Sequence, residues 1–174
     1  MLKDLVAALL LTIYAGVCFA GDPLGEFEAS VLKKGSAVAT TGPVVYYLKE
    51  SKKWGRATAT LGEVKYDVRK TDSLVTPFIG SVAFEVTERI STYASEADAR
   101  AAVRPKEKKE GALVHVFRLA YSYQGGIWRL TSGEENLQAL AQYNNWRASV
   151  KFTDVASARR VGQVLGPIAV AWVP

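Results

Sequence analysis

The sequence predicts an α+β fold in which a single curved antiparallel sheet has helices packed mainly on one face. Three observations lead to this prediction. Apolar and polar residues alternate over several short segments, which is typical of half-buried strands. The pair Gly125-Gly126 marks a tight hairpin. Helix-capping residues occur between strand segments, without the regular alternation that a parallel sheet requires.

The N-terminus has the pattern of an export signal. A basic residue precedes an apolar run over residues 5–17, and small Ala20 follows Cys18 at the spacing that a signal peptidase recognises. The run is shorter than the roughly 20 residues that a membrane-spanning helix needs, which disfavours an uncleaved anchor. A lipidated Cys18 is disfavoured because Val17 stands where lipoprotein signals need a small side chain.

Cys18 is the only cysteine, so residues 21–174 can form neither a disulfide nor a thiolate zinc site. They are numerous and apolar enough to bury one core without such links. An exported domain without cysteine fits a bacterial periplasm or cell exterior. We therefore expect a signal peptide over residues 1–20, no transmembrane anchor after processing, and one periplasmic or secreted α+β domain over residues 21–174.

The first half of this domain starts with a helix, which Asp22 caps and Gly35 ends. The apolar run over residues 44–48 is too short for its periodicity to distinguish a strand from a helix. Alternation then predicts two half-buried strands, over residues 64–68 and 82–90. Their connection contains a proline and is expected to be an irregular crossover or a bulged edge. A short capped helix follows at residues 95–103.

The second half contains a central strand over residues 113–123, which is apolar on both faces. After Gly125-Gly126 the chain returns antiparallel over residues 127–130. Ser132 and Glu135 have the spacing of a capping box and predict a further helix. The final elements expected are an extended segment over 147–152, a helix from Asp154 to Leu165, and an apolar strand over 168–173.

The residues YDVRKTDSLVTPFIG at 66–80 and YSYQGGIW at 121–128 resemble uncharacterised exported bacterial domains with a YDVxKTDSLVxPFxG segment. That family has no assigned reaction, so the resemblance implies a folded bacterial envelope domain and transfers no catalytic residue. The order of elements is also similar to that of cystatin-like and NTF2-like folds. This second likeness concerns element order alone.

The charge of the chain indicates which partners to expect. There are 22 Lys plus Arg against 17 Asp plus Glu, which gives a net charge of +5. In an exported protein such an excess favours anionic envelope polymers, lipid headgroups or acidic proteins, and nucleic acid is disfavoured there. The partner expected is therefore an envelope protein or an anionic polymer. A surface that only confers solubility is the alternative.

His115 is the only histidine, which excludes any metal site that needs two imidazoles. Because it lies between two valines in the central strand, we expect a hydrogen-bonded histidine at the margin of the core. A catalytic role would require a carboxylate beside it. Asp67 and Asp72 are the candidates for that carboxylate.

Two further groups are candidate binding residues. Asp67, Arg69 and Asp72 form a dense polar group that lines a pocket or, alternatively, makes an ion pair and caps a turn. Tyr121 and Tyr123 form an exposed aromatic ledge for a sugar or peptide or, alternatively, pack the sheet.

Several chemistries have no motif in this sequence, namely a phosphate-binding loop, a GxSxG elbow, an HExxH helix and a dinucleotide fingerprint. No cofactor or metal is therefore predicted. The hypothesis that the sequence favours is an exported non-enzymatic binding or accessory module of the bacterial envelope. One alternative is a pocket-based enzyme that uses His115 with Asp67 or Asp72, and another is a structural envelope subunit.

We predict that the chain is cleaved after Ala20, because the apolar run and the small residues around this position match the preference of signal peptidase. Intact-mass spectrometry of exported protein should give a mature chain that begins at Gly21. A mature N-terminus at Met1, or a mass that includes a lipid on Cys18, would contradict the assignment.

Overall fold

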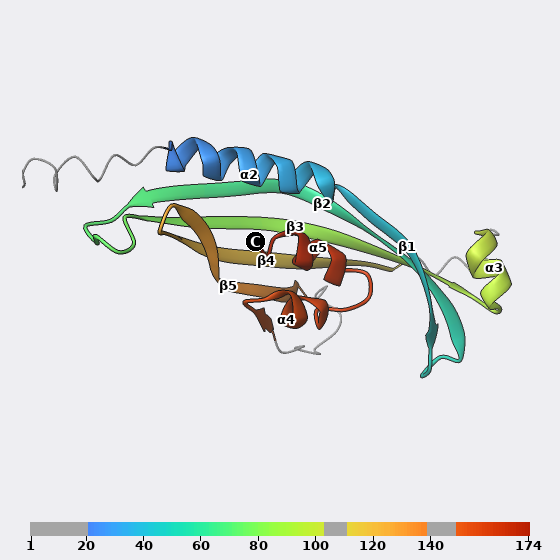
Figure 1. Cartoon of the computed structure of the whole chain (residues 1–174). Helices are drawn as coiled ribbons and strands as arrows, with labels where there is room; N and C mark the ends of the chain where they lie inside the picture. The colour runs from blue at the N-terminus through green and yellow to red at the C-terminus, as the bar shows by residue number, and fades with distance from the viewer. Residues whose placement is uncertain (1–20, 103–110, 139–148) are drawn as a thin grey trace, which may run out of the picture.

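The computed structural model describes residues 21–102, 111–138 and 149–174. It confirms the α+β class, with one curved antiparallel sheet (Figure 1). The strands are β1 (Thr40–Leu48), β2 (Lys53–Lys70), β3 (Phe78–Tyr93), β4 (Gly111–Gln124), β5 (Ile127–Gln138) and β6 (Val150–Phe152). Each pairs antiparallel with the next strand along the chain, so the order in the sheet is the order in the sequence.

The described helices are α2 (Pro23–Ala37), α3 (Glu96–Ala101), α4 (Val155–Arg159) and α5 (Gly166–Ala171). Figure 1 shows α2, α4 and α5 on one side of the sheet. Side chains at the even positions of β3, such as Val82 and Phe84, are buried in the core. By contrast, α3 packs on the other face, where Arg56 donates a hydrogen bond to the carbonyl of Ala99. Helices thus lie mainly on one face, as the sequence predicts. None of the described helices has the length and apolar character that crossing a bilayer demands.

The N-terminal helix begins as predicted, since the Asp22 carboxylate accepts a hydrogen bond from the backbone N–H of Leu24. It continues through Ala37, two residues beyond the expected end at Gly35. Its buried Phe27 lies over Gly80 of β3, where a β-carbon would come within 2.6 Å of the ring. The absence of a side chain at Gly80 therefore lets α2 lie close to the sheet.

The strands of the first half agree with the predicted alternation. Residues 44–48, which the sequence leaves unassigned, belong to β1. A bulge between Leu61 and Val64 interrupts the pairing of β2 with β3, and bulges of this kind bend a strand. The expected irregular connection is the loop over residues 71–77.

The predicted helix after Ser132 and Glu135 is wrong. Both residues lie in β5, where Ser132 pairs with Ala120 and Glu135 pairs with Phe117 of β4. The spacing of a capping box is a local signal, and here the hydrogen bonds to β4 and β6 determine the conformation instead. The expected continuation beyond residue 138 lies outside the described residues.

The C-terminal elements also differ from the prediction. Asp154 does cap a helix, but that helix is α4 and ends at Arg159 instead of Leu165. Residues 168–173 are not a strand, because residues 166–171 form α5 with Pro167 in its first turn. The buried residues here are Leu165, Ile168, Ala169 and Trp172. Their spacing of three and four is helical, whereas a short apolar run by itself is ambiguous.

The centre of the core is a stack of three aromatic rings. Phe84 of β3 stacks on Phe117 of β4, with ring centroids 4.9 Å apart, and on Trp172 at the same distance. Trp172 is fully buried, and its carbonyl oxygen accepts a hydrogen bond of 2.7 Å from the hydroxyl of Tyr121. The C-terminal segment is therefore fixed to the sheet by both its ring and its backbone.

We predict that valine at both Gly125 and Gly126 lowers the Tm by about 4–8 °C. Their φ angles are 58° and 84°, and a β-carbon at either position would meet no atom within 4 Å. The destabilisation then comes from backbone strain, roughly 1 kcal/mol or more per residue. Thermal unfolding by circular dichroism measures it. Ser81→Val, at an exposed strand position, is the control, and an unchanged Tm in the double variant would contradict the prediction.

Candidate functional site

Three ionisable side chains from neighbouring strands meet on the helix-covered face of the sheet. They are Glu88 of β3, His115 of β4 and Glu135 of β5. His115 pairs with Val86, two residues before Glu88, while Glu135 pairs with Phe117, two residues after His115. Both glutamates are thus diagonal neighbours of the histidine on one face, a distance that long side chains can cross.

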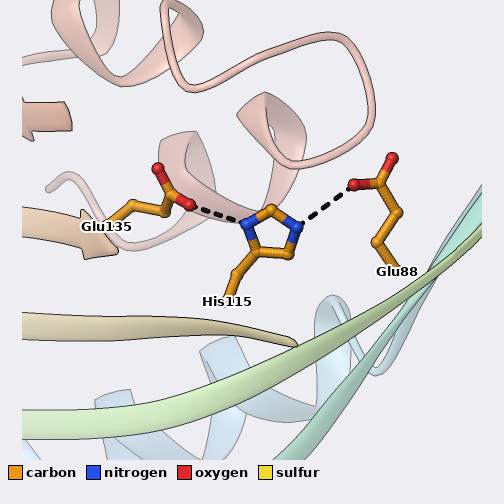
Figure 2. Close-up of polar contacts among 3 residues, drawn as sticks. All are labelled: Glu88, His115 and Glu135. Carbon is orange, nitrogen blue, oxygen red and sulfur yellow. Dashed lines mark hydrogen bonds and ion pairs between the residues drawn. The ribbon is translucent and has the colours of Figure 1, made fainter. Parts of the chain in front are cut away.

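His115 contacts both carboxylates (Figure 2). Its Nδ1 lies 2.6 Å from Oε1 of Glu135, and its Nε2 lies 3.2 Å from Oε2 of Glu88. The side chains of His115 and Glu135 are only 2% and 1% exposed, whereas that of Glu88 is 10% exposed. Glu88 is thus the member of this Glu–His–Glu group that is nearest to solvent.

The geometry favours a protonated histidine. A neutral imidazole has one N–H and can donate to only one of the two carboxylates, while an imidazolium donates to both. Burial lowers the pKa of His115, but the hydrogen bonds to Glu135 and Glu88 and their negative charges outweigh it, so its pKa lies above 6.5. An imidazolium between two carboxylates leaves one net negative charge in the group.

Glu88 lines a cleft with a volume of about 320 Å³. The other walls are Tyr46 and Tyr47 of β1 and the turn over residues 161–165, which connects α4 to α5. Burial and the negative charge of Glu88 raise the pKa of the Tyr46 hydroxyl, which reflects how near the carboxylate is. The cleft therefore combines the carboxylate of Glu88 with the phenol of Tyr46 and the turn, whereas the ring of Tyr47 packs against Trp54 on the opposite face of the sheet.

The predicted polar candidates lie elsewhere. Asp67 pairs with Arg69 at 2.6 Å, and both side chains are more than half exposed. Asp67 also faces the other side of the sheet, because it pairs with Ser81 at an odd position of β3. Asp72 is exposed in the loop between β2 and β3. His115 therefore has glutamates as its carboxylate partners in place of Asp67 or Asp72.

Tyr121 and Tyr123 are buried and pack the sheet. The ring of Tyr121 meets Phe27 of α2 edge to face, and Tyr123 contacts the rings of Phe78 and Trp128. Burial raises the pKa of the Tyr121 hydroxyl. The structure thus places Tyr121 under α2 and Tyr123 against rings of β3 and β5, not on an open ledge.

Sequence reasoning missed Glu88 and Glu135. Glu88 continues the inward series Val82, Phe84 and Val86, and a charged residue on the apolar side of a strand indicates a buried polar contact. That signal was available in the sequence. Glu135 was hidden by the incorrect helix, because a helical residue 135 would not face β4.

We predict that the domain loses stability as the pH rises above about 6.5, the ordinary pKa of histidine. The pKa of His115 is raised on folding, so its stabilisation is complete below the unfolded-state pKa and is lost as the pH rises through the folded-state pKa. Urea unfolding at a series of pH values from about 5.5 to about 9 measures how the free energy of unfolding depends on pH. His115→Gln should remove this histidine-dependent slope.

His115→Gln should also lower the free energy of unfolding by about 2–4 kcal/mol at pH 6, since two buried carboxylates lose a charged donor. The imidazole resonances of the only histidine report its pKa directly. That pKa should fall in Glu135→Gln, which preserves the shape of the partner and removes its charge. A histidine pKa at or below 6.5 in the wild-type protein would refute the assignment.

No family model, curated protein or solved structure matches this chain. The resemblance of residues 66–80 and 121–128 to exported bacterial domains stays a prediction.

Proposed function

We propose that the domain is an exported, non-enzymatic binding module of the bacterial envelope, and that it holds a partner protein through the cleft at Glu88. The observation that carries this proposal is the Glu–His–Glu group, which presents one carboxylate in a cleft beside Tyr46 and the turn over residues 161–165. The predicted signal peptide supports an exported location.

The chemistry of the cleft favours a positively charged group. A carboxylate attracts an ammonium or guanidinium ion, and tyrosine rings bind cations through their faces. The cleft thus fits a protein with an exposed basic side chain, whereas the net charge of +5 by itself favours an acidic protein or an anionic polymer.

The support for Glu88 is rigid. Its carboxylate contacts His115, which is itself held by the fully buried Glu135. A carboxylate fixed in this way loses little freedom when a cation binds, so less of the interaction energy is spent on ordering. Preorganisation of this kind is what a recognition site requires.

The position of His115 is consistent with binding without chemistry. His115 does not line the cleft, and its side chain is only 2% exposed, so it has no direct access to a bound group.

An enzyme is the second candidate, because one observation favours it. The hydrogen-bonded series from buried Glu135 through His115 to Glu88 has the order of a proton relay that ends at a cleft. In that case Glu88 would be the general acid or base. Chemical change of a bound probe, followed by mass spectrometry, distinguishes this candidate from a binding module.

We predict that N-acetyl-lysine methylamide and N-acetyl-arginine methylamide bind in the cleft with a Kd on the order of 1 mM. Two-dimensional NMR titration should shift the amide signals of Tyr46, Tyr47 and residues 162–165. Glu88→Gln should weaken binding about tenfold, equivalent to one charge-assisted contact. The neutral N-acetyl-norleucine methylamide should bind the wild-type protein at least as weakly as the charged probes bind Glu88→Gln.

Glu85→Gln is the matched control, because Glu85 is an exposed carboxylate of β3 that faces the other side of the sheet. It should leave the titration unchanged. Equal loss in both variants would show a general charge effect and refute the cleft. Saturable binding of poly-L-glutamate that outcompetes the lysine probe would favour the anionic-polymer alternative.

A further inference from the structure

A second cavity, of about 240 Å³, lies between α2 and the segment that follows α5. Figure 1 shows both helices on the same side of the sheet. Four aromatic residues contribute to its walls, namely Phe27, Tyr121, Trp128 and Trp172. The volume is below the roughly 300–1,000 Å³ of sites for drug-sized ligands, so a ligand here has to be small.

Lys34 brings a positive charge to this apolar cavity. Lys34 lies four residues after Ser30, so both side chains are on the same face of α2 and both line the cavity. Lys34 is half-buried, and within the described ranges no hydrogen-bond or ion-pair partner contacts it. Burial lowers the pKa of its ammonium group. An anion in the cavity would supply the partner that this ammonium ion lacks.

The indole N–H of Trp172 is fully buried and is not exposed to a ligand in the cavity, and in the part of the chain that the structure describes it has no acceptor. The other polar atoms on the aromatic walls are occupied, since Tyr121 donates to the carbonyl of Trp172 and Trp128 donates to the carbonyl of Pro23.

The aromatic rings define the rest of the ligand. Phe27 lies 5.5 Å from Tyr121 and 4.5 Å from Trp128, measured between ring centroids, with the planes strongly inclined. Rings at such distances are in contact with one another, so they form one continuous aromatic wall against which a further ring can pack. The cavity therefore has the properties of a site for a flat, apolar body with one anionic end.

We propose that this cavity binds a small arylalkanoic acid, with the carboxylate at Lys34 and the ring against the wall formed by Phe27, Tyr121 and Trp128. The site is separate from the Glu88 cleft, because the two share no lining residue. It takes a ligand of opposite charge, so it adds a second specificity to the domain.

Titration with 3-phenylpropanoate tests the proposal, because Trp128 and Trp172 report occupancy through their fluorescence. The acid should bind saturably and at least tenfold more tightly than 3-phenylpropanol, which lacks the charge. Lys34→Met removes the charge and keeps the stem, and it should remove this tenfold preference. Lys33→Met, one residue earlier and exposed, is the control and should bind like the wild type.

Ser30→Leu fills the wall of the cavity and should abolish binding of both probes, while Glu88→Gln should leave it intact. Failure of this site is therefore distinguishable from failure of the Glu88 cleft. Equal binding of the acid and the alcohol, wild-type affinity in Lys34→Met, retained binding in Ser30→Leu, or no saturable change up to about 10 mM acid would each overturn the proposal.

Discussion

The stacking of Trp172 on Phe84 is the contact on which the rest of the molecule depends. It attaches the C-terminal segment to the middle of the sheet. The carbonyl oxygen of Trp172 also accepts a hydrogen bond from the hydroxyl of Tyr121. The turn over residues 161–165 lies just before this anchor and forms one wall of the Glu88 cleft. Trp172 itself forms part of the second cavity. Both sites therefore exist only while this short segment stays in place.

The sheet separates its polar residues by face. On the face covered by helices, the described carboxylates of β3 and β5 are held in hydrogen bonds to His115. On the other face, Asp67 and Arg69 form an exposed ion pair, which in water contributes little to stability. A buried charge without a partner is unfavourable, so the two glutamates and the imidazole are best understood as one unit. Removing one member leaves the others uncompensated.

Local signals predicted the elements that local interactions form. The glycine pair of the hairpin and the caps at Asp22, Ser95 and Asp154 act within a few residues, and all are present in the structure. Pairing between strands overrode the capping pattern at Ser132, and packing against Phe84 made residues 166–171 helical. The candidate site depends on register, because only the alignment of β3, β4 and β5 brings Glu88 and Glu135 to His115. The identities of these partners therefore could not be derived from the sequence, although Glu88 itself was conspicuous.

The sheet order, which follows the chain order from β1 to β6, has a consequence for folding. Every strand pairs with the strand that follows it in the chain. The sheet can therefore grow one strand at a time, and each step costs little loop entropy. The stack of Trp172 on Phe84 is different, because it joins the middle of the chain to its C-terminal segment. Synthesis from the N-terminus thus produces a sheet whose central phenylalanines stay open until the final turns arrive. A chain that stalls before α5 would expose this surface to proteases and to other unfinished chains. The fold therefore becomes stable only when the C-terminal segment is complete.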